Sequence, residues 1–183
     1  MLKAMGEIQT RRLILRAPQD NDPIPSVELI GDTAERSSHT TDPRKAKRWN
    51  AFLSGIGHWQ MRGQGYYKIT DRESGEIYGR CGLLRHEETG ETQLSYQLYE
   101  GFEGNGYAFE AAVALRHHAG EAMDLPRLVS FIYPSNGRSR ALAHRLGATD
   151  EGPLVIEGET QILYRHLVWD APLARAQWWE VIR

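Results

Sequence analysis

The segment Gly101-Phe102-Glu103-Gly104-Asn105-Gly106-Tyr107-Ala108 marks the point where the hydrophobic period of the chain changes. Ahead of it, in residues 92–99, apolar Leu94, Tyr96 and Leu98 alternate with polar residues, which predicts a strand with one buried face. Behind it, alanines and Leu115 recur at helical spacing to about residue 122, and these small side chains would let a helix lie close to a sheet. The segment is therefore predicted to be a glycine turn between a strand and a helix.

Two interpretations of this glycine turn, residues 101–108, stay open. It is either a tight turn that caps a helix or an anion site, because successive backbone N–H groups near a helix N-terminus attract phosphate. The spacing is not Gly-x-Gly-x-x-Gly, so a Rossmann nucleotide site is not supported. No Gly-Lys-Ser/Thr follows, so a P-loop is not supported either.

A second strand-to-helix junction follows about thirty residues later, at Asn136-Gly137-Arg138-Ser139. Residues 128–132 form a short apolar strand, and residues 134–136 start a helix that Gly147 ends. Asn136 is expected to cap this helix, and Ser139 is either a surface hydroxyl or a functional one.

The rest of the chain predicts further elements on both sides of these junctions. The expected strands are residues 13–15, 66–70, 77–84, 154–156 and 162–169. The expected helices are a short one near residues 23–30, a longer one from Asp42-Pro43 through Trp59, and a terminal one after Pro172. This order predicts an α+β fold with a mixed, mainly antiparallel central sheet flanked by helices.

Composition excludes several classes of protein. The chain has 183 residues, which suits one domain, and its net charge of −2 argues against a nucleic-acid binder. No apolar stretch reaches the roughly 18 residues of a membrane span, and the first ten residues lack the apolar core of a secretory signal. The single cysteine, Cys81, is expected in the core, and neither it nor the histidines have metal-ligand spacing. We therefore expect a cytoplasmic protein with no metal, no nucleic-acid partner and no membrane contact.

Taken together, the two junctions resemble the GNAT superfamily of acyl-CoA-dependent N-acetyltransferases, and most closely its ribosomal-protein N-terminal acetyltransferase (RimJ/RimL-like) branch. The resemblance is carried by residues 104–111, 134–139 and 146–148, with support from residues 10–16 and 79–83. It covers about residues 7–168. It implies a GNAT-like sheet that is splayed at the cofactor cleft, in a single domain over residues 1–170 with a C-terminal tail, 171–183, that could be helical.

The resemblance also implies the roles of particular residues. Acetyl-CoA would be the co-substrate, and no metal would be needed. Ser139 would be catalytic, because in the family this serine can reach the departing sulfur. The residues implied in binding the coenzyme at its pyrophosphate, its pantetheine arm or its sulfur are Leu98, Tyr99, Gly104, Asn105, Gly106, Tyr107, Ala108, Asn136 and Ser139.

Direct attack of an amine on a thioester requires the amine to be neutral. An α-amino group with a pKa near 8 is roughly one-tenth neutral at pH 7, whereas a lysine near 10.4 is less than a thousandth neutral. The resemblance implies a carboxylate, present in many relatives, where this chain has Gln93, so a water chain, or Glu91 or Glu100 nearby, would have to serve instead. A site without a strong base favours a peptide or protein N-terminal α-amine as the acceptor.

Two further residues depart from the family pattern, and two alternative functions remain open. Gly101 stands where the broader superfamily often has Arg or Gln, and Glu103 places a negative charge near the expected phosphates, which Arg138 and Arg140 could offset. The alternatives are acetylation of a small-molecule amine and a non-catalytic acyl-CoA-binding module. The pair Trp178-Trp179 could pack on the domain or form a homodimer contact.

Overall fold

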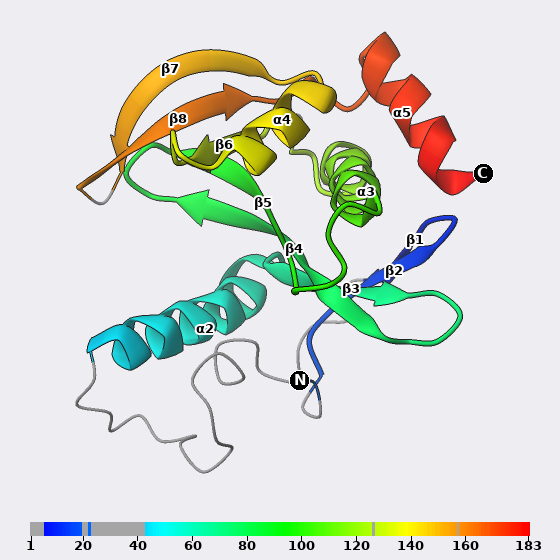
Figure 1. Ribbon diagram of the computed structural model, residues 1–183, viewed down its shortest axis with the longest axis horizontal. Helices are drawn as coiled ribbons and strands as arrows, with labels where there is room; N and C mark the ends of the chain where they lie inside the picture. The colour runs from blue at the N-terminus through cyan, green and yellow to red at the C-terminus, as the bar shows by residue number, and fades with distance from the viewer. Residues whose placement is uncertain (1–5, 20–21, 23–42, 126, 157) are drawn as a thin grey trace.

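The computed structural model describes residues 6–19, 22, 43–125, 127–156 and 158–183, in which helices pack against one eight-stranded sheet (Figure 1). The strands are β1 (Ile8–Gln9), β2 (Leu13–Arg16), β3 (Tyr66–Asp71), β4 (Ile77–His86), β5 (Glu91–Leu98), β6 (Val129–Ile132), β7 (Thr149–Ile156) and β8 (Glu159–Arg165). The helices are α2 (Pro43–Arg62), α3 (Tyr107–Glu121), α4 (Gly137–Arg145) and α5 (Pro172–Ile182).

The strands lie in the order β1-β2-β3-β4-β5-β6-β8-β7, and every neighbouring pair is antiparallel except β5 with β6. That pair is parallel because helix α3 carries the chain back across the sheet between the two strands. Its ladder consists of the single residue pair Gln93 and Val129, after which the strands diverge. The predicted mixed, mainly antiparallel α+β fold with a splayed sheet is confirmed.

Helix α3 is buried along most of its length, with the sheet on one side and α5 beside it (Figure 1). Its alanines Ala111, Ala112 and Ala119 have no exposed surface, in agreement with the stripe of small residues in the sequence. Arg116 is buried in the same helix and donates hydrogen bonds to the Leu146 carbonyl at 2.9 Å and to Gln177 Oε1 at 2.6 Å. Burial lowers the pKa of Arg116 to about 10.

The C-terminal residues 171–183 form part of the packed structure. Ala174 and Val181 of α5 are buried, and the Trp178 ring stacks on His117 of α3 with ring centroids 4.2 Å apart. Trp179, by contrast, is 55% exposed. Cys81 is fully buried, as expected of a core residue, and burial raises the pKa of its thiol.

Several element boundaries differ from the sequence predictions. Strand β8 ends at Arg165 and not at Trp169, because the Trp169 indole packs beside His117 and over Gly120 of α3. Strand β7 begins at Thr149, five residues before the predicted start, and continues past an irregularity before Pro153. The two-residue β1 is too short to show a period. The helix predicted near residues 23–30 and Asp42, the predicted start of the next helix, lie outside the described residues.

No helix in the described part of the chain is both long and apolar enough to cross a bilayer.

A buried polar pair supports the junction of β5 with β6. The Ser130 hydroxyl donates to the Leu94 carbonyl at 2.6 Å and lies 2.8 Å from His166 Nε2. His166 is 4% exposed, and burial lowers its pKa to about 3. In the unfolded chain this imidazole would take up a proton near pH 6.5, while in the folded protein it stays neutral. Its contribution to stability is therefore complete above pH 6.5 and is lost as the pH falls from there towards 3.

We expect His166→Gln to flatten the pH dependence of stability between pH 6 and pH 4. The free energy of unfolding, measured with urea at several pH values, should fall less steeply than in wild type by about 1.4 kcal/mol per pH unit, the effect of one proton. The exposed His144 provides the control, and His144→Gln should keep the wild-type slope. Equal slopes for His166→Gln and wild type would contradict the assignment.

Candidate active site

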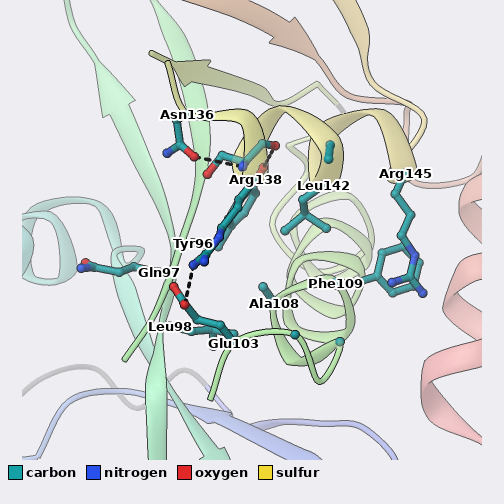
Figure 2. A pocket seen from close by; sticks show the side chains of 14 residues that line it. Tyr96, Gln97, Leu98, Glu103, Ala108, Phe109, Asn136, Arg138, Leu142 and Arg145 are labelled. Atoms are coloured by element: carbon teal, nitrogen blue, oxygen red, sulfur yellow. Dashed lines mark hydrogen bonds and ion pairs between the residues drawn. The ribbon is translucent and has the colours of Figure 1, made fainter. Parts of the chain in front are cut away.

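A cleft of about 840 Å³ lies where β5 and β6 diverge (Figure 2). Its walls come from the end of β5, from the glycine turn with the start of α3, and from α4. The lining residues are Tyr96, Gln97, Leu98, Glu103, Gly104, Gly106, Ala108, Phe109, Asn136, Arg138, Ser139, Ala141, Leu142 and Arg145. Both junctions that the sequence singles out therefore face the same cleft.

The backbone of the glycine turn explains why glycine is needed there. Gly104 and Gly106 have φ angles of 80° and 81°, in the left-handed region that side chains disfavour. A Cβ added at Gly104 would meet no atom within 4 Å, so the cleft is open above this residue. Gly106 is also the N-cap of α3 and offers no side-chain acceptor to the first N–H groups of the helix. These N–H groups and the helix dipole suit an anion, and the turn also starts the helix.

At the second junction, Ser139 is held through its backbone from two sides. Asn136 caps α4, because its Oδ1 accepts a hydrogen bond from the Ser139 N–H at 3.1 Å, as expected of an N-cap. The Tyr96 hydroxyl donates to the Ser139 carbonyl at 3.2 Å. Figure 2 shows the Asn136 amide nitrogen turned away from the capping bond. The capping role of Asn136 thus leaves its amide donor for another partner.

Tyr96 is a site residue that the sequence analysis assigned only to the buried face of a strand. Its ring lies between β5 and α4, and its hydroxyl ties the two walls of the cleft together. Burial raises the pKa of Tyr96, which keeps the hydroxyl protonated and able to donate. A tyrosine on the buried face of a strand that ends at the predicted junctions could have indicated this contact from the sequence, because a buried phenol hydroxyl needs a hydrogen-bond partner.

An ion pair joins the two junctions across the cleft. Glu103 of the glycine turn contacts Arg138 of α4, with Oε2 and Nη1 2.5 Å apart (Figure 2). Both side chains are largely exposed. Arg140 does not line the cleft, since it bonds to the Tyr164 hydroxyl at 3.0 Å and to the Pro134 carbonyl.

The cleft lining contains six of the nine residues predicted to bind the coenzyme, which are Leu98, Gly104, Gly106, Ala108, Asn136 and Ser139. Tyr99, Asn105 and Tyr107 lie outside the lining. The Tyr99 N–H donates to the Tyr78 carbonyl at 2.9 Å, and the Tyr107 ring packs on Tyr78 with centroids 4.5 Å apart. The Asn105 carbonyl accepts a hydrogen bond from Arg12 at 3.1 Å. The roles of all nine residues stay predictions.

Gln93 and the two carboxylates considered as bases, Glu91 and Glu100, also lie outside the lining. Gln93 Oε1 is 2.6 Å from His86 Nε2, and Glu91 forms an ion pair with Arg165 at 3.0 Å. His86 is an ionisable neighbour of Gln93 that the sequence analysis missed, because it comes from β4. In the described part of the chain, Glu103 is the one carboxylate of the cleft lining.

Comparisons with known proteins identify the family. Residues 12–149 match the family model of the acetyltransferase (GNAT) domain, so the chain belongs to the GNAT acetyltransferase family. It is 25% identical over 168 residues to the ribosomal protein uS5-alanine N-acetyltransferase of Escherichia coli (strain K12), covering 83% of this chain and 84% of that protein. It is also 25% identical to the uncharacterized protein YkkB of Bacillus subtilis (strain 168), covering 80% of this chain and 87% of YkkB.

Solved structures agree with this assignment. An acetyltransferase from Agrobacterium tumefaciens str. C58 is 33% identical, with a TM-score of 0.73 over 91% of this chain and 96% of that one. RimL, a ribosomal L7/L12 alpha-N-protein acetyltransferase solved in complex with coenzyme A, shares the fold at 21% identity, with a TM-score of 0.66 over 89% of this chain and 98% of that one. The family expected from the two junctions is confirmed, and its ribosomal-protein acetyltransferase group is among the relatives.

Among the described residues, no three or more His, Cys, Asp or Glu side chains are grouped so that they could hold a metal ion.

We expect Asn136→Ala to lower the free energy of unfolding by about 1 kcal/mol, because it removes the acceptor for an N–H group of the first turn of α4. Asn136→Ser keeps an oxygen acceptor at the cap and should retain most of that stability. Urea unfolding of the two variants and wild type measures the difference. Equal losses for alanine and serine would show that the cap does not stabilise α4.

Proposed function

We propose that the protein transfers an acetyl group from acetyl-CoA to a peptide or protein N-terminal α-amine. The observation that carries the proposal is that both strand-to-helix junctions line one cleft, next to the point where the sheet opens. The cleft offers an anion-binding turn on one wall and the serine-bearing helix α4 on another. A long ligand with phosphates at one end and a thioester at the other matches this arrangement.

The residues present fit the coenzyme. The N–H groups of the turn, Gly104, Asn105, Gly106, Tyr107 and Ala108, would hold the pyrophosphate, and the open space above Gly104 lets phosphate approach the backbone. On the facing wall, the Arg138 guanidinium of α4 is paired with Glu103 of the turn and would bind a phosphate in exchange for that partner. Leu98 and Tyr99 at the end of β5, together with the Asn136 amide, would bind the pantetheine arm. Acetyl-CoA, when bound, supplies the acetyl group as an activated thioester.

Ser139 would donate a hydrogen bond or a proton to the departing sulfur. The argument rests on rigidity, because the bonds from Asn136 and Tyr96 fix both ends of the Ser139 backbone unit. A donor fixed before the reaction stabilises developing negative charge without reorganising during it.

The choice of acceptor follows from the charges in the cleft. Glu103, the carboxylate of the described lining, is tied to Arg138, and so is poorly placed to deprotonate a strongly basic amine. An α-amine is already partly neutral at pH 7, whereas a lysine side chain is almost fully charged. The names of two relatives, the uS5-alanine N-acetyltransferase and RimL, describe transfer to protein α-amines, which supports the same acceptor class here.

The test is binding followed by turnover. Acetyl-CoA at 100 times its Kd should stabilise the protein by about 2.7 kcal/mol, which a thermal shift or urea titration detects. Release of free CoA should then be faster with N-terminal peptides than with lysine side chains blocked at the α-amine. The absence of stabilisation would contradict the proposal. Turnover restricted to small amines would indicate a small-molecule acetyltransferase, and tight binding without turnover would indicate an acyl-CoA-binding module.

We expect Ser139→Ala to lower kcat at least tenfold with little change in the KM for acetyl-CoA, because the hydroxyl would act on the leaving sulfur after binding. Steady-state kinetics with an N-terminal peptide measure both constants. Ser74→Ala, in the turn between β3 and β4, is the control and should behave as wild type. A wild-type kcat for Ser139→Ala would remove this hydroxyl from the mechanism.

A further inference from the structure

The back of the glycine turn is held by one side chain from the start of the chain, Arg12. Its Nη1 donates to the Asn105 carbonyl at 3.1 Å, and its Nε and Nη2 both lie 2.7 Å from Glu110 Oε2. The guanidinium also lies over the Tyr107 ring, 4.7 Å from its centroid. We propose that Arg12 is a positioning residue that sets the orientation of the anion-binding turn. The inference rests on the proposed use of acetyl-CoA.

Glu110 makes Arg12 a fixed part of the structure. Its side chain is 3% exposed, in the first turn of α3. Its Oε1 accepts hydrogen bonds from the Thr10 hydroxyl at 2.6 Å and from the Arg12 N–H at 2.9 Å, while Oε2 receives the guanidinium. A carboxylate buried this deeply is costly unless its oxygens are satisfied, and here four donors from the β1–β2 region satisfy them.

The link from Arg12 to the cleft is a single peptide group. The carbonyl of Asn105 and the N–H of Gly106 belong to that group, and in a trans peptide they point in opposite directions. Because Arg12 holds the carbonyl at the back of the turn, the Gly106 N–H must point to the other side, where Gly106 lines the cleft. Glycine permits many orientations of this peptide, so the bond from Arg12 selects one of them.

Arg12 does not itself line the cleft. It borders a second cavity of about 290 Å³, which shares Gly104, Gly106, Phe109 and Arg145 with the cleft lining. Nitrogens on both edges of the guanidinium are bonded to Asn105 or Glu110. Arg12 would therefore act on a ligand in the cleft through the turn.

This assignment predicts that Arg12 matters only for a donor that carries the pyrophosphate. S-acetylpantetheine has the same thioester and arm as acetyl-CoA but lacks the pyrophosphate and the nucleotide. For Arg12→Gln, the KM for acetyl-CoA should rise about tenfold with a small change in kcat, and kcat/KM for S-acetylpantetheine should equal that of wild type. Arg12→Lys keeps the charge without the planar fork and should restore only part of the affinity.

Arg11→Gln is the matched control, because Arg11 is the neighbouring arginine and its side chain is exposed. It should leave both donors unaffected. An equal loss with the two donors would mean that Arg12 only supports the fold, and an unchanged KM for acetyl-CoA would mean that it does not orient the turn. Either result overturns the inference while the proposed function stands. If Arg12→Gln does not fold, the comparison between donors is made with Arg12→Lys, and the same two results overturn the inference. Wild-type protein that binds no acetyl-CoA overturns the proposed function as well.

Discussion

The parallel contact between β5 and β6 determines where the site forms. The strands share one ladder pair, Gln93 with Val129, and the next residues are linked through the Ser130 hydroxyl and the Leu94 carbonyl. The Nε2 atom of His166 lies within hydrogen-bond distance of this hydroxyl, and both residues are buried. The two strands are thus joined firmly at one end and separate at the other. Their separation produces a cleft in the middle of a sheet without leaving the sheet in two pieces.

Two side-chain contacts and the packing of one helix then give the cleft its shape. Tyr96 connects the β5 wall of the cleft to α4, and Arg12 connects the glycine turn to Glu110 of α3. Helix α5 covers the outer side of α3. Each contact joins a part of the site to an element whose position is already fixed by the core. The backbone groups that face the cleft are therefore arranged by side chains and a helix that the core already holds in place, which is the usual requirement of a preorganised site.

The sequence contained enough local information for most of the fold. The alternation around Leu94, the glycines of the turn and the alanines of α3 are short-range patterns, and each predicted its element correctly. The boundaries that were wrong depend on tertiary packing: Trp169 leaves the sheet because it packs on Gly120, which no period in its own segment indicates.

Predicting the site was harder for the same reason. The junctions at Gly104 and Asn136 could be found because backbone geometry restricts which residues occupy such turns. Tyr96 and Ser139 are 43 residues apart in the sequence, and Arg12 and Glu110 are 98 apart. Local spacing patterns do not indicate contacts over such sequence separations. The position of His86 beside Gln93 likewise depends on the pairing of β4 with β5.

The bridge between Glu103 and Arg138 has a consequence for how an anionic ligand enters. If a phosphate binds at the turn, as proposed, it would meet an arginine already paired with a carboxylate and would have to replace Glu103 before it gains that charge. Dissolved ions screen an exposed pair of this kind, since the Debye length falls to about 8 Å at physiological ionic strength. Salt would thus weaken both the Glu103–Arg138 ion pair and the attraction between Arg138 and a phosphate that replaces Glu103. Phosphate binding beside this ion pair would therefore depend less on ionic strength than binding beside an unpaired arginine.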